Sequence, residues 1–95
     1  MTTTACINVL LYDGYPVPKI FFDQVRQQVE GVIPALERNE CYTLEMLCGP
    51  IYWDKLDDGD RRLAGRCMSD MVVNNMLPLE VAESKHEYPK WYRLK

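Results

Sequence analysis

The sequence is poor in the residues that most enzyme sites require. It contains one histidine, His86, and its five glycines are scattered, so that no glycine-rich phosphate loop can be recognised. No CxxC or HxxxH spacing indicates zinc, and the aspartates between positions 54 and 60 lack the spacing and closing glutamate of a calcium loop. No motif places a cysteine beside His86 to form a nucleophile pair. We therefore expect a protein that is not an enzyme and that uses neither a metal nor a cofactor.

Long apolar runs are also missing. No stretch approaches the ~20 apolar residues of a membrane-spanning helix, and the first four residues carry no basic start of a signal peptide. The four cysteines, Cys6, Cys41, Cys48 and Cys67, are an even set, but Cys67 falls on the apolar stripe of a predicted helix, where a reduced thiol packs well. We expect free thiols in a reducing, cytoplasmic setting and no association with a membrane.

An overall basic charge, typical of nucleic-acid-binding domains, is absent as well. The formal net charge is −3, yet its distribution is uneven. Residues 1–48 hold three basic and six acidic side chains, whereas residues 49–95 hold eight of each. From Lys85 onward there are four basic residues against one acidic residue. An anion-binding face is therefore predicted at the C-terminal end.

The first part of the chain predicts a strand and then a long helix. Residues 1–17 read as a strand rich in large apolar side chains, a turn at Asp13-Gly14 and a proline-rich turn. Residues 18–37 read as an amphipathic helix that Pro34 kinks or interrupts. Its buried stripe recurs at steps of three and four: Phe22, Val25, Val29, Ile33 and Leu36.

The second part predicts a helical middle over residues 41–77 and a β-hairpin over residues 79–95. A brief helix from Leu44 to Cys48 is followed by a longer one that Asp57 or Asp58 caps and that ends by Leu77. The polar face of the longer helix includes Asp70. Taken together, the pattern indicates one α+β domain over residues 1–95, with a helix-turn-helix-like middle.

The C-terminal hairpin holds the main candidate binding residues. If the alternate residues Tyr92 and Leu94 face the core, the intervening side chains share the outer face. Basic residues that contact phosphates and an aromatic residue that stacks on a base would then lie together. The same composition suits a protein interface, and in the reversed register Trp91 would be buried. The candidate binding residues are Lys85, His86, Lys90, Trp91, Arg93 and Lys95.

Three arginines on the longer helix are secondary candidates. Arg61, Arg62 and Arg66 lie about one turn apart, and the last two share a face. A DNA-reading helix would use such residues on phosphates or guanine edges. We favour a structural role instead, because the acidic start of the helix would repel a phosphate backbone and can pair with the arginines locally.

Short motifs of the C-terminal half resemble a group of small uncharacterised bacterial, phage and plasmid proteins. The motifs are Tyr42-Thr-Leu-Glu-Met-Leu-Cys-Gly, Trp53-Asp-Lys-Leu, Arg61-Arg-Leu-Ala-Gly-Arg, Val72-Val-Asn-Asn-Met-Leu-Pro and Tyr92-Arg-Leu-Lys. The resemblance implies a winged-helix-like fold. Families with this fold include DNA-binding regulators and proteins of unknown role. The acidic helix start departs from typical DNA-reading helices.

The sequence therefore predicts a non-enzymatic regulatory binding module of the kind carried by phages or mobile elements. The basic C-terminal wing favours weak association with nucleic acid. The acidic composition favours the rival, a protein-binding module such as an inhibitor, an antitoxin-like partner or a phage accessory protein. The sequence leaves homodimerisation as an alternative, because the methionines Met68, Met71 and Met76 would form an adaptable groove if they were partly exposed.

Overall fold

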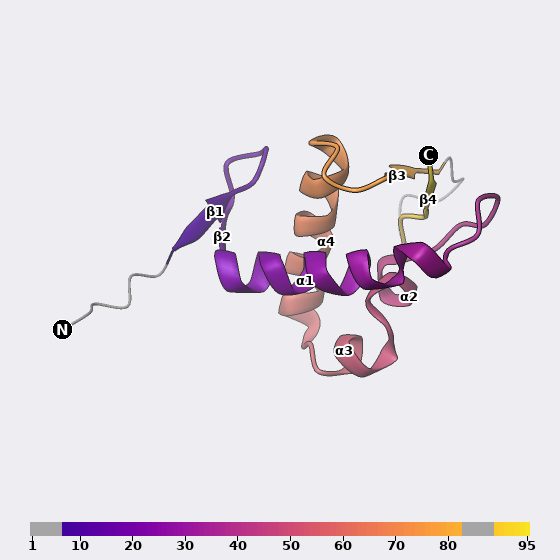
Figure 1. Cartoon of the computed structure of the whole chain (residues 1–95). Helices are drawn as coiled ribbons and strands as arrows, with labels where there is room; N and C mark the ends of the chain where they lie inside the picture. The colour runs from indigo at the N-terminus through magenta and orange to yellow at the C-terminus, as the bar shows by residue number, and fades with distance from the viewer. Residues whose placement is uncertain (1–6, 83–88) are drawn as a thin grey trace.

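The computed structural model describes residues 7–82 and 89–95 of the chain, and these residues form an α+β fold. Within them are four α-helices, one 3₁₀ helix (η1) and two antiparallel two-stranded sheets (Figure 1). The elements in chain order are β1 (Asn8–Leu10), β2 (Pro16–Pro18), α1 (Lys19–Val32), η1 (Ile33–Ala35), α2 (Leu44–Cys48), α3 (Pro50–Asp54), α4 (Asp58–Val73), β3 (Leu79–Val81) and β4 (Tyr92–Leu94). None of the helices in this part of the chain has the length and apolar character needed to cross a membrane.

The predicted N-terminal strand and the turn at Asp13-Gly14 are present. Gly14 adopts a φ of 84°, which glycine tolerates without strain, and its N–H donates to the carbonyl of Leu11 at 2.8 Å. Residues 16–18, in the proline-rich segment, are extended and form strand β2, which pairs with β1 around the central pair Val9↔Val17. An edge strand tolerates proline because its outward N–H groups need no partner.

Helix α1 is shorter than predicted. Its buried face consists of Phe22, Val25 and Val29, as the periodicity indicated. The α-helix ends at Val32 and the chain continues as η1, in which Pro34 lies near the start. Proline has no N–H for the α-helical bond to residue i−4, and the tighter 3₁₀ turn accommodates that loss.

The helical middle contains one helix more than predicted. Helix α2 has the predicted bounds, and Thr43 caps it by accepting a hydrogen bond from the Met46 N–H. Gly49, at a φ of 84°, ends α2 and precedes α3, which opens with Pro50. Proline at the first helical position has no N–H to leave unpaired, so it can begin a helix directly after another has ended.

Helix α4 begins as predicted and forms the centre of the core. Asp57 is its N-cap and accepts a hydrogen bond of 2.8 Å from the Asp60 N–H. Asp70, predicted on the polar face, is only 4 % exposed, because the N-terminal hairpin packs over this part of the helix. The buried apolar residues of α4 are Ala64, Cys67, Met68 and Met71, and Met76 packs against them partly buried. The methionines are therefore chiefly core residues.

The two small sheets lie at different ends of the helical core. Helix α1 crosses α4, with the β1–β2 hairpin at the start of α1 and the β3–β4 hairpin beyond the end of α4 (Figure 1). A bridge between Tyr42 and Tyr92 attaches the segment before α2 to β4, and each tyrosine N–H donates to the other's carbonyl at 2.7 Å. This bridge places the α1–α2 connection beside the C-terminal strand.

Candidate nucleic-acid interface

The register of the C-terminal hairpin directs Tyr92 inward and Arg93 outward. Strand β4 pairs with β3 through Leu79↔Leu94 and Val81↔Tyr92, and Tyr92 is 2 % exposed. The reversed register, with an exposed Tyr92, is therefore wrong. Trp91 is half-buried rather than fully exposed, so only part of its ring is available to a ligand.

Each described basic residue of this hairpin has a polar partner that holds its side chain. The Arg93 Nε donates to Glu80 Oε2 at 2.7 Å across the strand pair, and the side chains are 46 % and 40 % exposed. The Lys95 Nζ donates to Asn75 Oδ1 at 2.6 Å, beyond the end of α4. These contacts orient the cationic groups at the surface, and an exposed ion pair of this kind is weak enough to rearrange for a ligand.

Arg93 and Lys95 line one side of an open hollow of about 310 Å³. The other side comes from the loop between η1 and α2, which contributes Arg38. Among the residues that the structure describes, the lining is Arg38, Asn39, Cys41, Arg93, Leu94 and Lys95, with three cationic side chains and no acidic side chain. This volume is at the small end of the ligand-pocket range.

Sequence reasoning did not identify Arg38, which lies 55 positions before Arg93 in the chain. Tyr42 holds its loop in place: the Tyr42 hydroxyl oxygen accepts a hydrogen bond of 2.9 Å from the Glu37 N–H, and the Tyr42 backbone pairs with Tyr92. Residues 41–44 could form a short strand, which is the one available signal, but nothing in the sequence specified β4 as its partner.

Two of the three arginines on α4 are engaged by other parts of the fold. Arg61 donates to the Trp53 carbonyl from Nε and Nη2, at 3.4 and 3.2 Å, and its guanidinium lies 5.5 Å from the centre of the Trp53 ring. Arg62 is exposed. The ion pair of Arg61 is with Asp54 at 3.9 Å rather than with the aspartates that begin α4.

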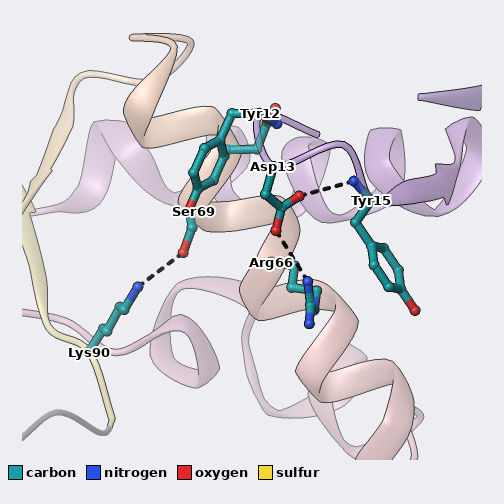
Figure 2. Close-up of polar contacts among 7 residues, drawn as sticks. Tyr12, Asp13, Tyr15, Arg66, Ser69 and Lys90 are labelled. Atoms are coloured by element: carbon teal, nitrogen blue, oxygen red, sulfur yellow. Dashed lines mark hydrogen bonds and ion pairs between the residues drawn. The ribbon is translucent and has the colours of Figure 1, made fainter. Parts of the chain in front are cut away.

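Arg66 fastens the N-terminal hairpin to α4. Its Nη1 donates to Asp13 Oδ2 at 3.2 Å, and its guanidinium stacks 4.4 Å from the centre of the Tyr15 ring. Figure 2 shows Arg66 facing the turn between β1 and β2, with Ser69 on the same helix facing Lys90. The Arg66 side chain remains half exposed, but its contacts with Asp13 and Tyr15 would have to be shared or exchanged before it could bind DNA.

Lys90 joins the C-terminal segment to the same turn of α4. Its Nζ donates to the Ser69 hydroxyl oxygen at 3.3 Å (Figure 2). Lys90 is half-buried, so it lies nearer the helix than a fully solvated lysine would. The predicted binding residues Lys85 and His86 lie outside the part of the chain that the structure describes.

The thiols differ sharply in accessibility. Burial raises the pKa of Cys48 to about 12, and burial together with the negative charge of Asp70 raises the pKa of Cys67 to about 12. Neither thiol is a nucleophile near neutral pH, because the thiolate is the reactive form. Cys41 is free and exposed.

A second hollow, of about 420 Å³, differs in chemistry from the first. Lys55 is its one basic lining residue, and Cys48, Pro50, Ile51 and Tyr52 supply much of the rest. It has neither the cluster of cations nor a set of converging polar groups, so it carries no comparable signal for an anion.

Comparison of the chain with protein-family models, curated proteins and solved structures finds no match.

Proposed function

We propose that this chain is a non-enzymatic, winged-helix-like binding module that associates weakly with nucleic acid through its C-terminal wing, the β3–β4 hairpin. The observation that carries the proposal is the clustering of Arg38, Arg93 and Lys95 around one open hollow, whose described lining residues include no acidic side chain. The order of helix α4 followed by a two-stranded hairpin agrees with the proposed architecture.

Phosphate contacts explain why these residues suit a nucleic-acid backbone. Arginine presents a planar fork of N–H donors that matches phosphate oxygens, and lysine adds a point charge. Lys90, Arg93 and Lys95 lie on one segment at the surface, and Trp91 offers part of a ring for stacking on a base. The net charge of −3 predicts that the association is local and weak.

The test is a titration with mixed-sequence duplex DNA, followed by tryptophan fluorescence, at ~50 and ~200 mM salt. Three phosphate contacts predict that affinity for the duplex falls roughly 40-fold over this range. Arg93→Glu should abolish binding, and Arg93→Gln should weaken it without placing a carboxylate opposite Glu80. Lys55→Glu is the matched control, since Lys55 is an exposed residue at the other hollow. Unchanged binding by Arg93→Glu would refute the proposal.

A protein-binding function is the second candidate, and a different surface favours it. Large apolar side chains are exposed on the N-terminal hairpin and at the start of α1: Ile7 (65 %), Leu10 (71 %), Tyr12 (58 %), Tyr15 (44 %) and Ile20 (75 %). Exposed apolar clusters of this kind mark interaction sites. Binding there should vary little with salt and should be lost in Leu10→Asp, while Arg93→Glu leaves it unchanged.

A further inference from the structure

The hollow beside β4 has a charge pattern suited to more than a single backbone phosphate. Its three cationic side chains come from two chain segments, Arg38 from the loop before α2 and Arg93 and Lys95 from the last strand. Glu37 and Glu40 belong to the same loop as Arg38 but do not line the hollow. An anion in the hollow therefore meets positive charge from both chain segments.

An internal phosphodiester carries one negative charge, whereas a phosphomonoester carries about −1.5 to −2 at neutral pH. The second charge is attracted by every cation of the hollow, and charged hydrogen bonds from arginine are among the stronger ones in proteins. Because Glu80 pairs with Arg93, the cluster offers a surplus of two positive charges, which matches a phosphomonoester more closely than a diester. The volume of about 310 Å³ is larger than a single phosphate group needs and leaves room for an attached sugar.

The cationic groups are also positioned before any ligand arrives. Glu80 holds the Arg93 guanidinium at 2.7 Å, and Asn75 holds the Lys95 ammonium at 2.6 Å. The Tyr42 hydroxyl fixes the loop of Arg38 through the Glu37 N–H. These contacts keep the cationic groups beside the hollow, so a ligand has to share or exchange weak partners but need not gather the side chains from solvent.

We infer that the hollow formed by Arg38, Arg93 and Lys95 is a phosphomonoester site, which receives the terminal phosphate of a nucleic-acid strand or the phosphate of a free nucleotide. This inference rests on the proposed nucleic-acid association and names the part of the ligand that the hollow recognises. Asn39, at the rim, adds a side-chain amide that can donate to a phosphate or sugar oxygen.

Cys41 supplies a reporter inside the site, because it lines the hollow and its thiol is exposed. In a Cys6→Ser background, a thiol reagent near pH 8 should modify Cys41 while the buried Cys48 and Cys67 react only on unfolding. A ligand in the hollow covers Cys41 and slows its modification.

The experiment compares a short single strand carrying a 5′-phosphate with the same strand carrying a 5′-hydroxyl, and adds adenosine monophosphate and inorganic phosphate as separate probes. We expect the phosphorylated strand to bind at least about tenfold more tightly, as one additional charged hydrogen bond would give. It should also protect Cys41, whereas the hydroxyl strand should not. Protection by adenosine monophosphate, without any preference between the strands, would identify a free nucleotide as the source of the phosphate.

Two variants test the geometry. Arg38→Gln should weaken binding of the 5′-phosphate strand more than binding of the 5′-hydroxyl strand, and so remove the preference between them. Tyr42→Phe, which keeps the ring and loses the oxygen that accepts from Glu37, should reduce the preference in part. Lys55→Gln at the other hollow should have no effect.

The outcomes separate the two proposals. Equal binding of the two strands, with no probe protecting Cys41, would overturn the phosphomonoester site and leave the nucleic-acid association standing. Protection of Cys41 by a small phosphate probe, with no strand binding at any salt concentration, would overturn the nucleic-acid association and leave the site standing. No binding and no protection would overturn both.

Discussion

The buried carboxylate of Asp70 accepts a hydrogen bond of 2.6 Å from the backbone N–H of Tyr12, a residue 58 positions earlier in the chain. The contact joins the turn of the N-terminal hairpin to the middle of α4. Together with the Arg66–Asp13 ion pair, it fixes where the hairpin sits on the helix.

Asp70→Ala should lower the free energy of unfolding by about 1–3 kcal/mol, because the Tyr12 N–H would lose its acceptor in a partly buried position. Asp70→Asn keeps an oxygen and should have a smaller effect. Urea denaturation followed by tryptophan fluorescence measures both. Asp23→Ala, which removes an exposed ion pair with Lys19, is the control and should change stability by less than ~0.5 kcal/mol. Equal effects of the Asp70 and Asp23 variants would contradict the assignment.

Arg66→Ala should destabilise the docked hairpin by about 0.5–1 kcal/mol, since it removes an exposed ion pair and a cation–π contact with Tyr15. Arg66→Lys keeps the charge but loses the planar stacking group, so it should recover only part of the loss. A double-mutant cycle with Asp13→Ala measures the ion pair itself. A coupling energy of zero would show that Arg66 acts through Tyr15 alone.

Asp57→Ala should lower stability by about 1 kcal/mol, because Asp57 accepts the Asp60 N–H at the start of α4. Asp58→Ala is a matched control that removes a carboxylate one residue later without removing the cap. Thermal unfolding followed by circular dichroism compares the two. The prediction fails if Asp58→Ala is as destabilising as Asp57→Ala.

Tyr52→Phe should leave stability unchanged or raise it by up to ~1 kcal/mol. The Tyr52 hydroxyl is buried and has no hydrogen-bond partner among the described residues, and burial raises its pKa. Phenylalanine keeps the packed ring and removes the unpaired polar atom. A clear loss of stability in chemical denaturation would mean that the hydroxyl has a partner, such as a bound water.

The buried thiols predict a loss of stability in alkali. The pKa of Cys48 and that of Cys67 are each raised from 9.0 to about 12, so above pH 9 the unfolded chain releases these protons while the folded chain retains them. The free energy of unfolding should therefore fall as the pH rises from 9 towards 12, and the slope should be smaller in Cys67→Ala. In Asp70→Asn the pKa of Cys67 should be lower, because the negative charge that raises it is gone. A slope identical in all three proteins would exclude the thiols as its cause.

Local chemistry was sufficient to predict the helices with clear signals. The carboxylate of Asp57 marks the start of α4, and the spacing of apolar residues up to Met71 marks its buried face. Helix α2 ends at Cys48 because Gly49 can adopt a positive φ. The alternation in the last residues left two registers open, and the structure has the one in which Tyr92 faces inward.

Features that depend on distant pairing were not accessible from the sequence. The prolines at positions 16 and 18 favour extended backbone but do not show that residues 16–18 pair with β1. Asp70 has the polarity of a surface residue and is buried because the hairpin covers it. Arg38 belongs to the candidate site only because Tyr42 bridges to Tyr92. Helix α3 was missed because a proline such as Pro50 can end a helix as readily as begin one.

The prolines of β2 have a consequence for assembly. The Lys19 N–H donates to Ile7 and the Leu11 N–H donates to Tyr15, so alternation turns the amide positions of Pro16 and Pro18 away from β1. That outer edge offers carbonyl acceptors but no donors, and a further strand cannot complete a hydrogen-bonded ladder along it. The hairpin can thus display apolar side chains while this edge resists sheet extension, the route by which many exposed strands aggregate.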